Sequence, residues 1–276
     1  MSFDMNACWS RGIELVRDNF QLLLLIAATF LLLPTVALYL LLPDMQTLMD
    51  PRTDPAALQA LLAENSGQWT LVLLVSLGLQ FAGFAAMVAL MGKARPTVGQ
   101  ALATGLKSVP GLFLVLISVF VLYLIGAALI LVPISLLTGA AGAPALGLIA
   151  VIPVLLLIVW LLARLSMTMP VMVLEGRSNP FAAMLRSYRL TRPRQWAILL
   201  FWGVLFAVFT VISVLFNGII GLIAALFGSG LATLLIVGLA NGITSLVAGM
   251  IICALAAAMF GQLAQPSAPS AVDPLA

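Results

Sequence analysis

Six long apolar runs, separated by short polar stretches, dominate the pattern along the chain. A helix needs about 20 mainly apolar residues to cross the hydrocarbon core of a membrane. Runs of that length occupy residues 22–42, 69–91, 110–137, 145–173, 196–227 and 231–260. The pattern therefore predicts an all-α integral membrane protein with six transmembrane helices, which form one domain over residues 1–261. Residues 262–276 are expected to form a disordered cytoplasmic tail.

The first run is expected to stay in the protein as a transmembrane helix. Its apolar stretch of about 21 residues exceeds the 7–15 of a signal-peptide core, and no small-residue cleavage site follows it directly. Several of the other runs exceed 25 residues, so tilted or kinked helices are expected. The candidate kink sites are Pro34, Pro133, Pro153 and Pro170.

The polar segments before the first, third and fifth runs share the spacing i, i+3, i+4, i+7, which places four residues on one face of a helix. Copies are offset by 93 and then 83 residues, and the same offsets align Phe20, Phe113 and Trp196. The pattern predicts a threefold repeat of a short amphipathic interfacial helix followed by a membrane hairpin. The alternative is chance, because polar linkers between spans are often amphipathic. The matched residues are Met5, Cys8, Trp9 and Gly12; Val98, Ala101, Leu102 and Gly105; and Phe181, Met184, Leu185 and Tyr188.

The third copy carries the clearest helix signals. Asn179 is suited to cap a helix, and Pro180 fits the first helical position. Arg186 and Arg189 fall on the other side of the helix from Phe181. A helix with an apolar face and a basic face is expected to lie in the plane of the inner membrane interface.

The basic residues predict an orientation. If the six runs cross in alternation, eleven of the twelve Lys and Arg residues fall on one side of the membrane, and Arg52 is the exception. The positive-inside rule makes that side cytoplasmic. We therefore expect a multi-pass protein with cytoplasmic N and C termini, in the cytoplasmic (inner) membrane of a bacterium, which the Ala-, Leu- and Gly-rich composition also favours.

The segment 43–68 is the one sizeable polar segment on the outer side. Asp54 and Pro55, followed by Leu58, Leu61 and Leu62, predict a short capped helix there. Trp69 then falls where an interfacial aromatic residue belongs.

The composition offers little catalytic chemistry. Charged residues make up 8% of the chain against about 25% in soluble domains, and there is no histidine, which is the commonest metal ligand and neutral-pH base. The two cysteines, Cys8 and Cys253, are not expected to pair. The acidic residues of the outer segment have no His or Cys companions, so no metal, cofactor, nucleic-acid partner or enzymatic activity is expected. These acidic residues are Asp44, Asp50, Asp54 and Glu64.

A few polar residues fall at membrane depth. Arg164 lies late in the fourth run, and Glu175 follows it after Pro170. Two interpretations are open: Arg164 reaches out to the inner head groups, or it is buried and forms an ion pair with Glu175. Residues expected to hold helices together are Asn217 and Asn241, as polar groups, and Gly238 and Gly242, as small ones.

Four arginines cluster after the fourth run. They either fix the orientation alone or also contact anionic lipid head groups, where each basic residue contributes about 1 kcal/mol. The cluster consists of Arg186, Arg189, Arg192 and Arg194.

The stretch from Arg164 to Trp196 resembles the membrane domain of glycerophosphoryl diester phosphodiesterases and related six-span bacterial membrane proteins. The shared pattern is an arginine late in a span, then a proline and Glu175, a short helix with small residues and Ser187, and a further span. In the phosphodiesterases that the sequence resembles, hydrolysis belongs to a separate soluble barrel domain with acidic and histidine residues. Such a catalytic domain is absent from this sequence, so the resemblance implies a membrane module and no phosphodiesterase activity.

Three functions are compatible with these features. The first is a non-enzymatic membrane protein that organises or senses lipid, or scaffolds a protein partner or a second copy of itself, through its basic interfacial helices. The second is a transporter or permease subunit, although the spans contain no midplane carboxylate and the chain contains no phosphate-binding glycine loop. The third is an integral membrane enzyme, for which a single carboxylate at Glu175 gives weak support.

Overall fold

In the computed structural model the described residues are 3–42, 45, 47, 53–92, 96–140, 151–228 and 230–264. Within them every regular element is helical. Six helical segments are long and apolar enough to cross a membrane: Phe20–Leu41, Ser66–Leu90, Val98–Leu137, Val151–Leu174, Pro180–Ala225 and Leu231–Leu263. Within the described ranges these segments cover the six predicted runs to within two residues at each end, so the prediction of six spans is confirmed. The predicted tail lies outside the described residues beyond Ala264.

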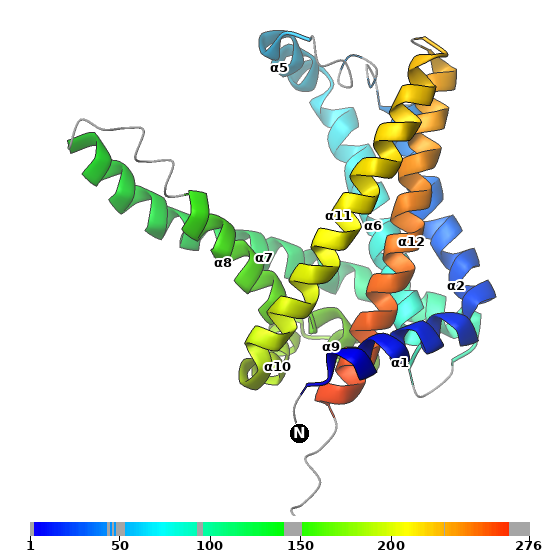
Figure 1. The fold of residues 1–276 in the computed structure, drawn as a ribbon, viewed down its shortest axis with the longest axis vertical. Coiled ribbons are helices and arrows are strands. Elements are labelled where there is room, and N and C mark those ends of the chain that lie inside the picture. The colour runs from blue at the N-terminus through cyan, green and yellow to red at the C-terminus, as the bar shows by residue number, and fades with distance from the viewer. Residues whose placement is uncertain are drawn as a thin grey trace, which may run out of the picture.

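The sixth span, α12 (Leu231–Leu263), lies at the centre of the molecule. Of its most apolar stretch, 61% is buried, against 6% of the corresponding stretch of α7 (Val98–Ala140). The first span, the second and the fifth stand beside α12, as Figure 1 shows. They are formed by α2 (Phe20–Ala27), η1 (Ala28–Leu32) and α3 (Leu33–Leu41); α6 (Ser66–Leu90); and α11 (Gln195–Ala225).

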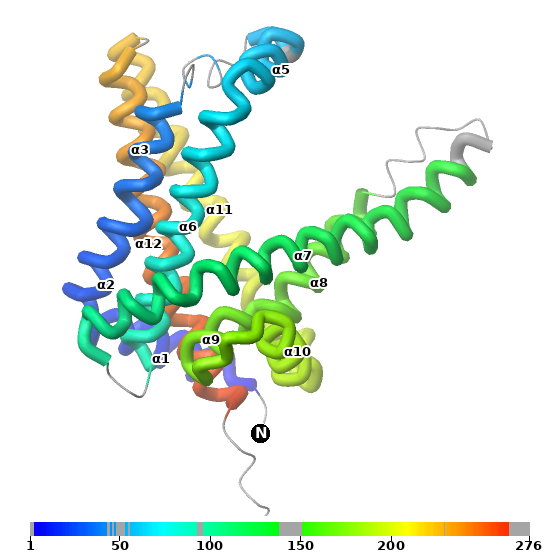
Figure 2. Tube along the Cα trace, turned by 180° about the vertical axis from the view of Figure 1, so that it is seen from behind, coloured from blue at the N-terminus to red at the C-terminus, as the bar shows by residue number. Residues whose placement is uncertain are grey.

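The third and fourth spans form an arm that diverges from this upright group. α7 crosses α6 and then runs beside α8 (Val151–Leu165), away from α12 (Figures 1 and 2). Residues 141–150, between α7 and α8, lie outside the described residues. The arm explains why so little of α7 is buried: its beginning packs on the upright group, and beyond that it packs mainly on α8.

Short helices gather at one end of the molecule. α1 (Met5–Asp18), α9 (Thr168–Leu174) and α10 (Pro180–Thr191) lie there with the N-terminus, whereas α5 (Pro55–Glu64) lies at the other end (Figure 2). We call the end that holds α1, α9 and α10 the basic end. The side of a membrane that it faces stays a prediction.

The predicted helix caps form. The Asn179 side chain accepts hydrogen bonds from the backbone N–H groups of Phe181 and Ala182 at 3.0 and 3.3 Å, with Pro180 at the first position of α10. At the other end of the molecule, Asp54 caps α5 through the N–H of Ala56. Both segments therefore begin where the sequence predicts.

In each segment at the basic end a pair of small residues packs inward. In α1 the pair is Cys8 and Gly12, four apart on the predicted apolar face and buried together with Leu15, whereas Met5 and Trp9 of that face are exposed. Small residues approach a neighbouring backbone closely, and large ones do not. The same spacing of four recurs in the other two segments, offset by 93 and then 82 residues, one fewer than predicted for the third copy. The equivalent buried pairs are Ala101 with Gly105 and Ala183 with Ser187.

Each of these small faces packs on the part of an even-numbered span that lies toward the basic end. Gly12 faces Leu255 of α12, and Gly105 faces the backbone of Ala82 in α6. Ser187 contacts the end of α8. The first segment of the chain thus packs on the last span as each later segment packs on the span before it.

The second of these segments is continuous with the third span, which the sequence did not predict. α7 runs through Pro110 as one helix of 43 residues. A proline removes one backbone donor and usually bends a helix, but it does not have to end it. At about 1.5 Å per residue the helix is about twice as long as a bilayer core is thick, so its first part belongs outside the span.

Two other prolines mark irregular backbone. Pro34 follows the π-helical turn η1, and Pro170 follows the break between α8 and α9 at residues 166–167. A proline ring obstructs the carbonyl group four residues earlier, which for Pro170 is that of Ser166. The fourth span therefore ends its regular helix shortly after Arg164.

Glycines of α12 lie against the first span. A Cβ atom at Gly238 would meet Tyr39, and one at Gly242 would lie 3.1 Å from Leu32 Cγ. The asparagines do not bridge helices: Asn217 and Asn241 donate to carbonyl groups of their own helices, at 2.9 and 3.0 Å. Close approach of backbone and small side chains, rather than polar contacts, holds α12 against its neighbour.

Candidate functional site

Arg164 lies in the last turn of α8 and is 6% exposed. α10 and the start of α11 pack against this turn, so the side chain does not reach out to the head groups as one interpretation expected. A cation at the C-terminal end of a helix interacts favourably with the helix dipole. The burial of its side chain nevertheless removes the guanidinium from water, which is costly without a hydrogen-bonded partner.

The backbone of Arg164 is held by α10. The hydroxyl group of Ser187 donates to its carbonyl oxygen at 2.9 Å. The hydroxyl group of Thr191 lies 3.2 Å from the same oxygen, and its single proton is shared with the carbonyl oxygen of Ser187 at 3.0 Å. The last carbonyl groups of a helix have no partner within it and need outside donors. α10 supplies them, and it thereby fixes the end of the fourth span against itself.

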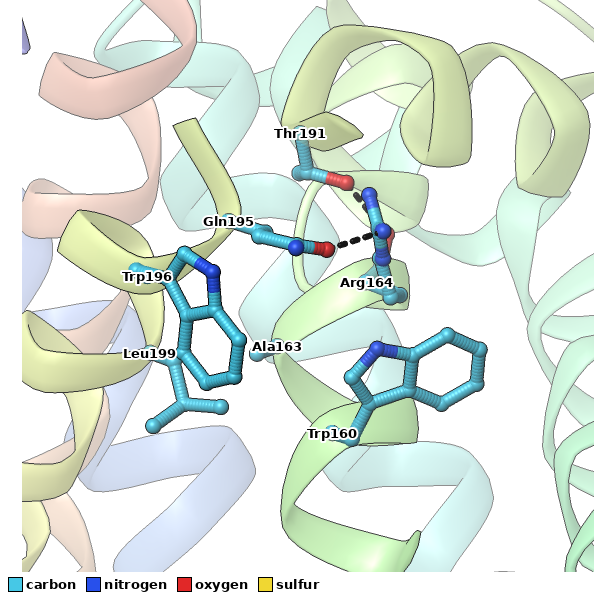
Figure 3. A pocket seen from close by; sticks show the side chains of 7 residues that line it. All are labelled: Trp160, Ala163, Arg164, Thr191, Gln195, Trp196 and Leu199. Atoms are coloured by element: carbon cyan, nitrogen blue, oxygen red, sulfur yellow. Dashed lines mark hydrogen bonds between the residues drawn. The ribbon is translucent and has the colours of Figure 1, made fainter. Parts of the chain in front are cut away.

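The guanidinium of Arg164 is incompletely paired. Its Nη2 donates to Gln195 Oε1, as the dashed line in Figure 3 shows. The guanidinium carbon, Arg164 Cζ, lies 4.6 Å from the ring centroid of Tyr188 and 5.5 Å from that of Trp160. The Nε and Nη1 atoms are buried and have no hydrogen-bond partner. Cation–π contacts therefore cover part of the group while two donor atoms stay unsatisfied.

A small pocket adjoins this guanidinium (Figure 3). Its walls come from α8, the end of α10 and the start of α11. The Trp196 side chain stands on the pocket wall and is 73% exposed. The lining residues are Trp160, Ala163, Arg164, Thr191, Gln195, Trp196 and Leu199.

The ion pair between Arg164 and Glu175, the second of the two open interpretations, is not among the contacts of the described residues. Glu175 ends α9 and accepts from Arg177 Nε at 2.7 Å and from Arg186 Nε at 3.3 Å. The helix break before Pro170 and the length of α9 carry this carboxylate away from the end of α8. The neutral side chain of Gln195 lies at Arg164 where that interpretation put Glu175.

The four clustered arginines have unequal surroundings. Arg186 is bound to Glu175, and Arg194 is half-buried. Arg189 and Arg192 are exposed, and within the described part of the chain neither forms an ion pair or a side-chain hydrogen bond. The free positive charge of the cluster therefore lies mainly at the C-terminal end of α10.

Other chemistry is sparse in the described ranges. They hold no group of three or more His, Cys, Asp or Glu side chains placed to bind a metal ion. Cys8 and Cys253 are both free and buried. Asp44, Asp50 and Arg52 of the outer segment lie outside the described residues.

Sequence reasoning missed three residues of the site: Gln195, Trp160 and Tyr188. Trp160 and Arg164 are four apart and share a face of α8, so their spacing was a usable signal. Tyr188 in α10 and Gln195 in α11 lie on either side of the turn at Arg192–Arg194, and no helical spacing connects them. The packing that brings them beside Arg164 was not visible in the sequence.

This fold and this pocket define a polytopic α-helical integral membrane protein with a buried arginine at the end of one span. Residues 142–266 match the family model described as the membrane domain of glycerophosphoryl diester phosphodiesterase. The match contains every residue of the pocket, and it confirms the resemblance found between Arg164 and Trp196. Searches of the curated proteins and of the solved structures find no match.

Proposed function

We propose that this protein is a non-enzymatic, lipid-organising protein of the bacterial cytoplasmic membrane, with the basic end on the cytoplasmic side. The observation that carries the proposal is the exposure of Arg189 and Arg192 on a helix whose exposed apolar residues are Phe181 and Leu185. A helix of this kind places its apolar side chains among acyl chains and its cations among anionic head groups.

The repeated construction of the basic end supports the proposal. Three interfacial segments each pack a small-residue face on an even-numbered span. Their other faces are exposed, as at Trp9 in α1 and Leu106 in α7. A ring of such segments would present an extended surface to the head groups of one leaflet, which suits a protein that gathers lipid. The threefold repeat is part of this proposal.

The matched family does not argue for hydrolysis. The family is named for the membrane domain of an enzyme that acts on glycerophosphoryl diesters. Hydrolysis needs positioned acids, bases or a metal, and the best carboxylate at the basic end, Glu175, is bound to two arginines. We therefore propose a membrane function without catalysis.

The experiment is lipid analysis of the protein in nanodiscs formed directly from the membrane. Mass spectrometry gives the ratio of phosphatidylglycerol and cardiolipin to phosphatidylethanolamine around the protein. Replacement of Arg189 and Arg192 by Gln should remove about 1 kcal/mol per residue, which is roughly a thirtyfold loss of affinity for anionic lipid. Extension to Arg186 and Arg194 should add less, because Arg186 is already paired.

Two controls separate charge from fold and from orientation. Replacement of Arg189 and Arg192 by Lys keeps the charge and should keep the anionic lipid. Arg11→Gln removes a cation that is paired with Glu14 at the same end, and it should change the ratio little. Equal enrichment in wild type and in the Arg189→Gln, Arg192→Gln variant, with unchanged topology, would rule the proposal out.

A transporter or permease subunit is the second candidate, and the low burial of α7 favours it. A membrane partner, or a second copy of this chain, would cover the α7–α8 arm. Co-purification of a stoichiometric ATPase, without enrichment of anionic lipid, would select this function. Co-purification of further copies alone would leave the lipid-organising function in place.

A further inference from the structure

We infer that the pocket beside Arg164 binds a phosphate group, supplied by the head group of a membrane phospholipid. The inference deepens the proposed function and rests on it for the source of the phosphate. It rests independently on the pocket for the phosphate itself. The ligand would be a single bound lipid, distinct from the more mobile lipids attracted by Arg189 and Arg192.

Within the ranges that the structure describes, the positive charge of Arg164 is not balanced by an anion. A guanidinium has five N–H donors, and the one hydrogen bond it makes goes to a neutral amide. Two of its nitrogen atoms, Nε and Nη1, are buried without a partner. Among the described residues no carboxylate lies within ion-pair distance of it. A buried cation in this state lacks an anion.

The unpartnered nitrogens of the Arg164 guanidinium have a geometry that suits an anion with two oxygens. Trp160 and Tyr188 lie within cation–π distance of the guanidinium. The unpartnered groups are in-plane N–H donors, which suit the paired oxygens of a phosphate or carboxylate. The amide of Gln195 can turn and offer its NH₂ group to the same anion, in exchange for the carbonyl oxygen that it now offers to Arg164.

The pocket lies at a depth where lipid phosphate groups are expected. It lies at the end of the fourth span, beside the last turn of α10 and close in sequence to the exposed Arg192. This is where the apolar part of the chain ends and phosphate groups of one leaflet are expected. Carboxylate lipids are rarer than phosphate lipids at such a surface, so phosphate is the ligand to which we commit.

The pocket must widen to admit the ligand. Its present free volume is about 10 Å³, which is near the minimum for one water molecule. Trp196 on the pocket wall is mostly exposed, so it can turn away with little loss of buried contacts. The lining residues Ala163, Arg164 and Thr191, by contrast, are held in place by the packing of α8 against α10. A phosphate would therefore enter past Trp196.

The test uses thermal unfolding of the purified full chain in an uncharged detergent. The probes are dihexanoyl phosphatidylglycerol, sodium phosphate, and an uncharged short-chain diacylglycerol as the blank. The wild type should unfold at a higher temperature with the phosphatidylglycerol than with the blank. The shift should saturate as a single site does.

Two variants make the result specific. Gln195→Glu places a carboxylate against Arg164, so the protein should stay folded without lipid and lose the shift. Arg164→Gln should lose it too. Arg189→Gln with Arg192→Gln should keep the shift, even though this variant loses the bulk enrichment in nanodiscs. Failure of the pocket and failure of the proposed function are therefore measured separately.

The outcomes divide cleanly. A shift with phosphatidylglycerol that disappears in Gln195→Glu supports the inference. An equal shift with millimolar sodium phosphate keeps the phosphate site but overturns the lipid as its source. No shift in the wild type, or a shift of the same size in folded Gln195→Glu protein, overturns the site.

Discussion

The hydroxyl group of Ser187 in α10 donates a 2.9 Å hydrogen bond to the backbone carbonyl oxygen of Arg164, 23 residues earlier in α8. Thr191, one turn further on, donates to the same oxygen. A helix end that would otherwise need water is thereby completed by a neighbouring helix. This contact joins the fourth span to α10 and fixes where the Arg164 pocket lies along that span.

Loss of this contact should destabilise the protein. Ser187→Ala removes one hydrogen-bond donor to the buried carbonyl oxygen of Arg164. Thr191→Val removes the second donor at nearly constant side-chain volume. Each should lower the free energy of unfolding by about 1 kcal/mol, and the pair by more than either alone. Thermal unfolding in detergent measures the loss. Ser118→Ala is the control, because Ser118 is exposed and donates only within its own helix; an equal loss there would refute the contact's role.

Enlargement of Gly105 should separate α7 from α6. A Cβ atom there would collide with the backbone oxygen of Ala82, which cannot turn aside as a side chain can. Gly105→Ala should therefore cost about 1–3 kcal/mol of stability, and Gly105→Val more. Gly99→Ala in the same helix has open space around it and should be neutral or slightly stabilising. A stable Gly105→Val variant would show that the two helices do not cross here.

The thiol of Cys8 should react slowly with maleimide. Burial raises its pKa from 9.0 to about 11, and the thiolate is the reactive form. Labelling should rise about tenfold per pH unit up to that value. The raised pKa also means that its contribution to stability is complete below pH 9 and is lost as the pH rises toward 11. Transfer of the thiol to exposed position 10, as Cys8→Ser with Ser10→Cys, should give fast labelling at pH 7.5.

Neutralisation of Glu175 should strengthen the interaction with anionic lipid. Its carboxylate binds Arg177 and Arg186, so Glu175→Gln releases both cations at the basic end. The ratio of phosphatidylglycerol to phosphatidylethanolamine in nanodiscs should rise above that of the wild type. Glu14→Gln, which frees only Arg11 in α1, is the matched change. A ratio that falls in Glu175→Gln would mean that the pairing organises the lipid surface.

The sequence specified the spans and the helix caps because both depend on residues close together in the chain. Run length separates a span from a linker, and Asn179 caps α10 through its own neighbours. The basic cluster was also visible, but its division into paired Arg186 and exposed Arg189 was not. That division depends on Glu175, which α9 brings back toward α10.

The packing of α1 and α10 was only partly visible in the sequence. The spacing placed Met5, Trp9 and Phe181 on the apolar faces of helices expected at the membrane interface, and these side chains are exposed. It did not show which residues pack inward on the spans. In water large apolar residues would turn inward. Beside a membrane they gain as much from lipid, and the small residues turn inward because they let backbones approach.

By itself, the sequence determined the class of protein, the number of spans, the caps of α5 and α10, and the family that its second half resembles. Only the tertiary structure decided which faces pack, that α7 continues through Pro110, and that Arg164 meets Gln195 rather than Glu175. The physical reason is range. Hydrophobic length and capping act over a few residues, whereas the partner of a long buried side chain is set by how distant helices cross.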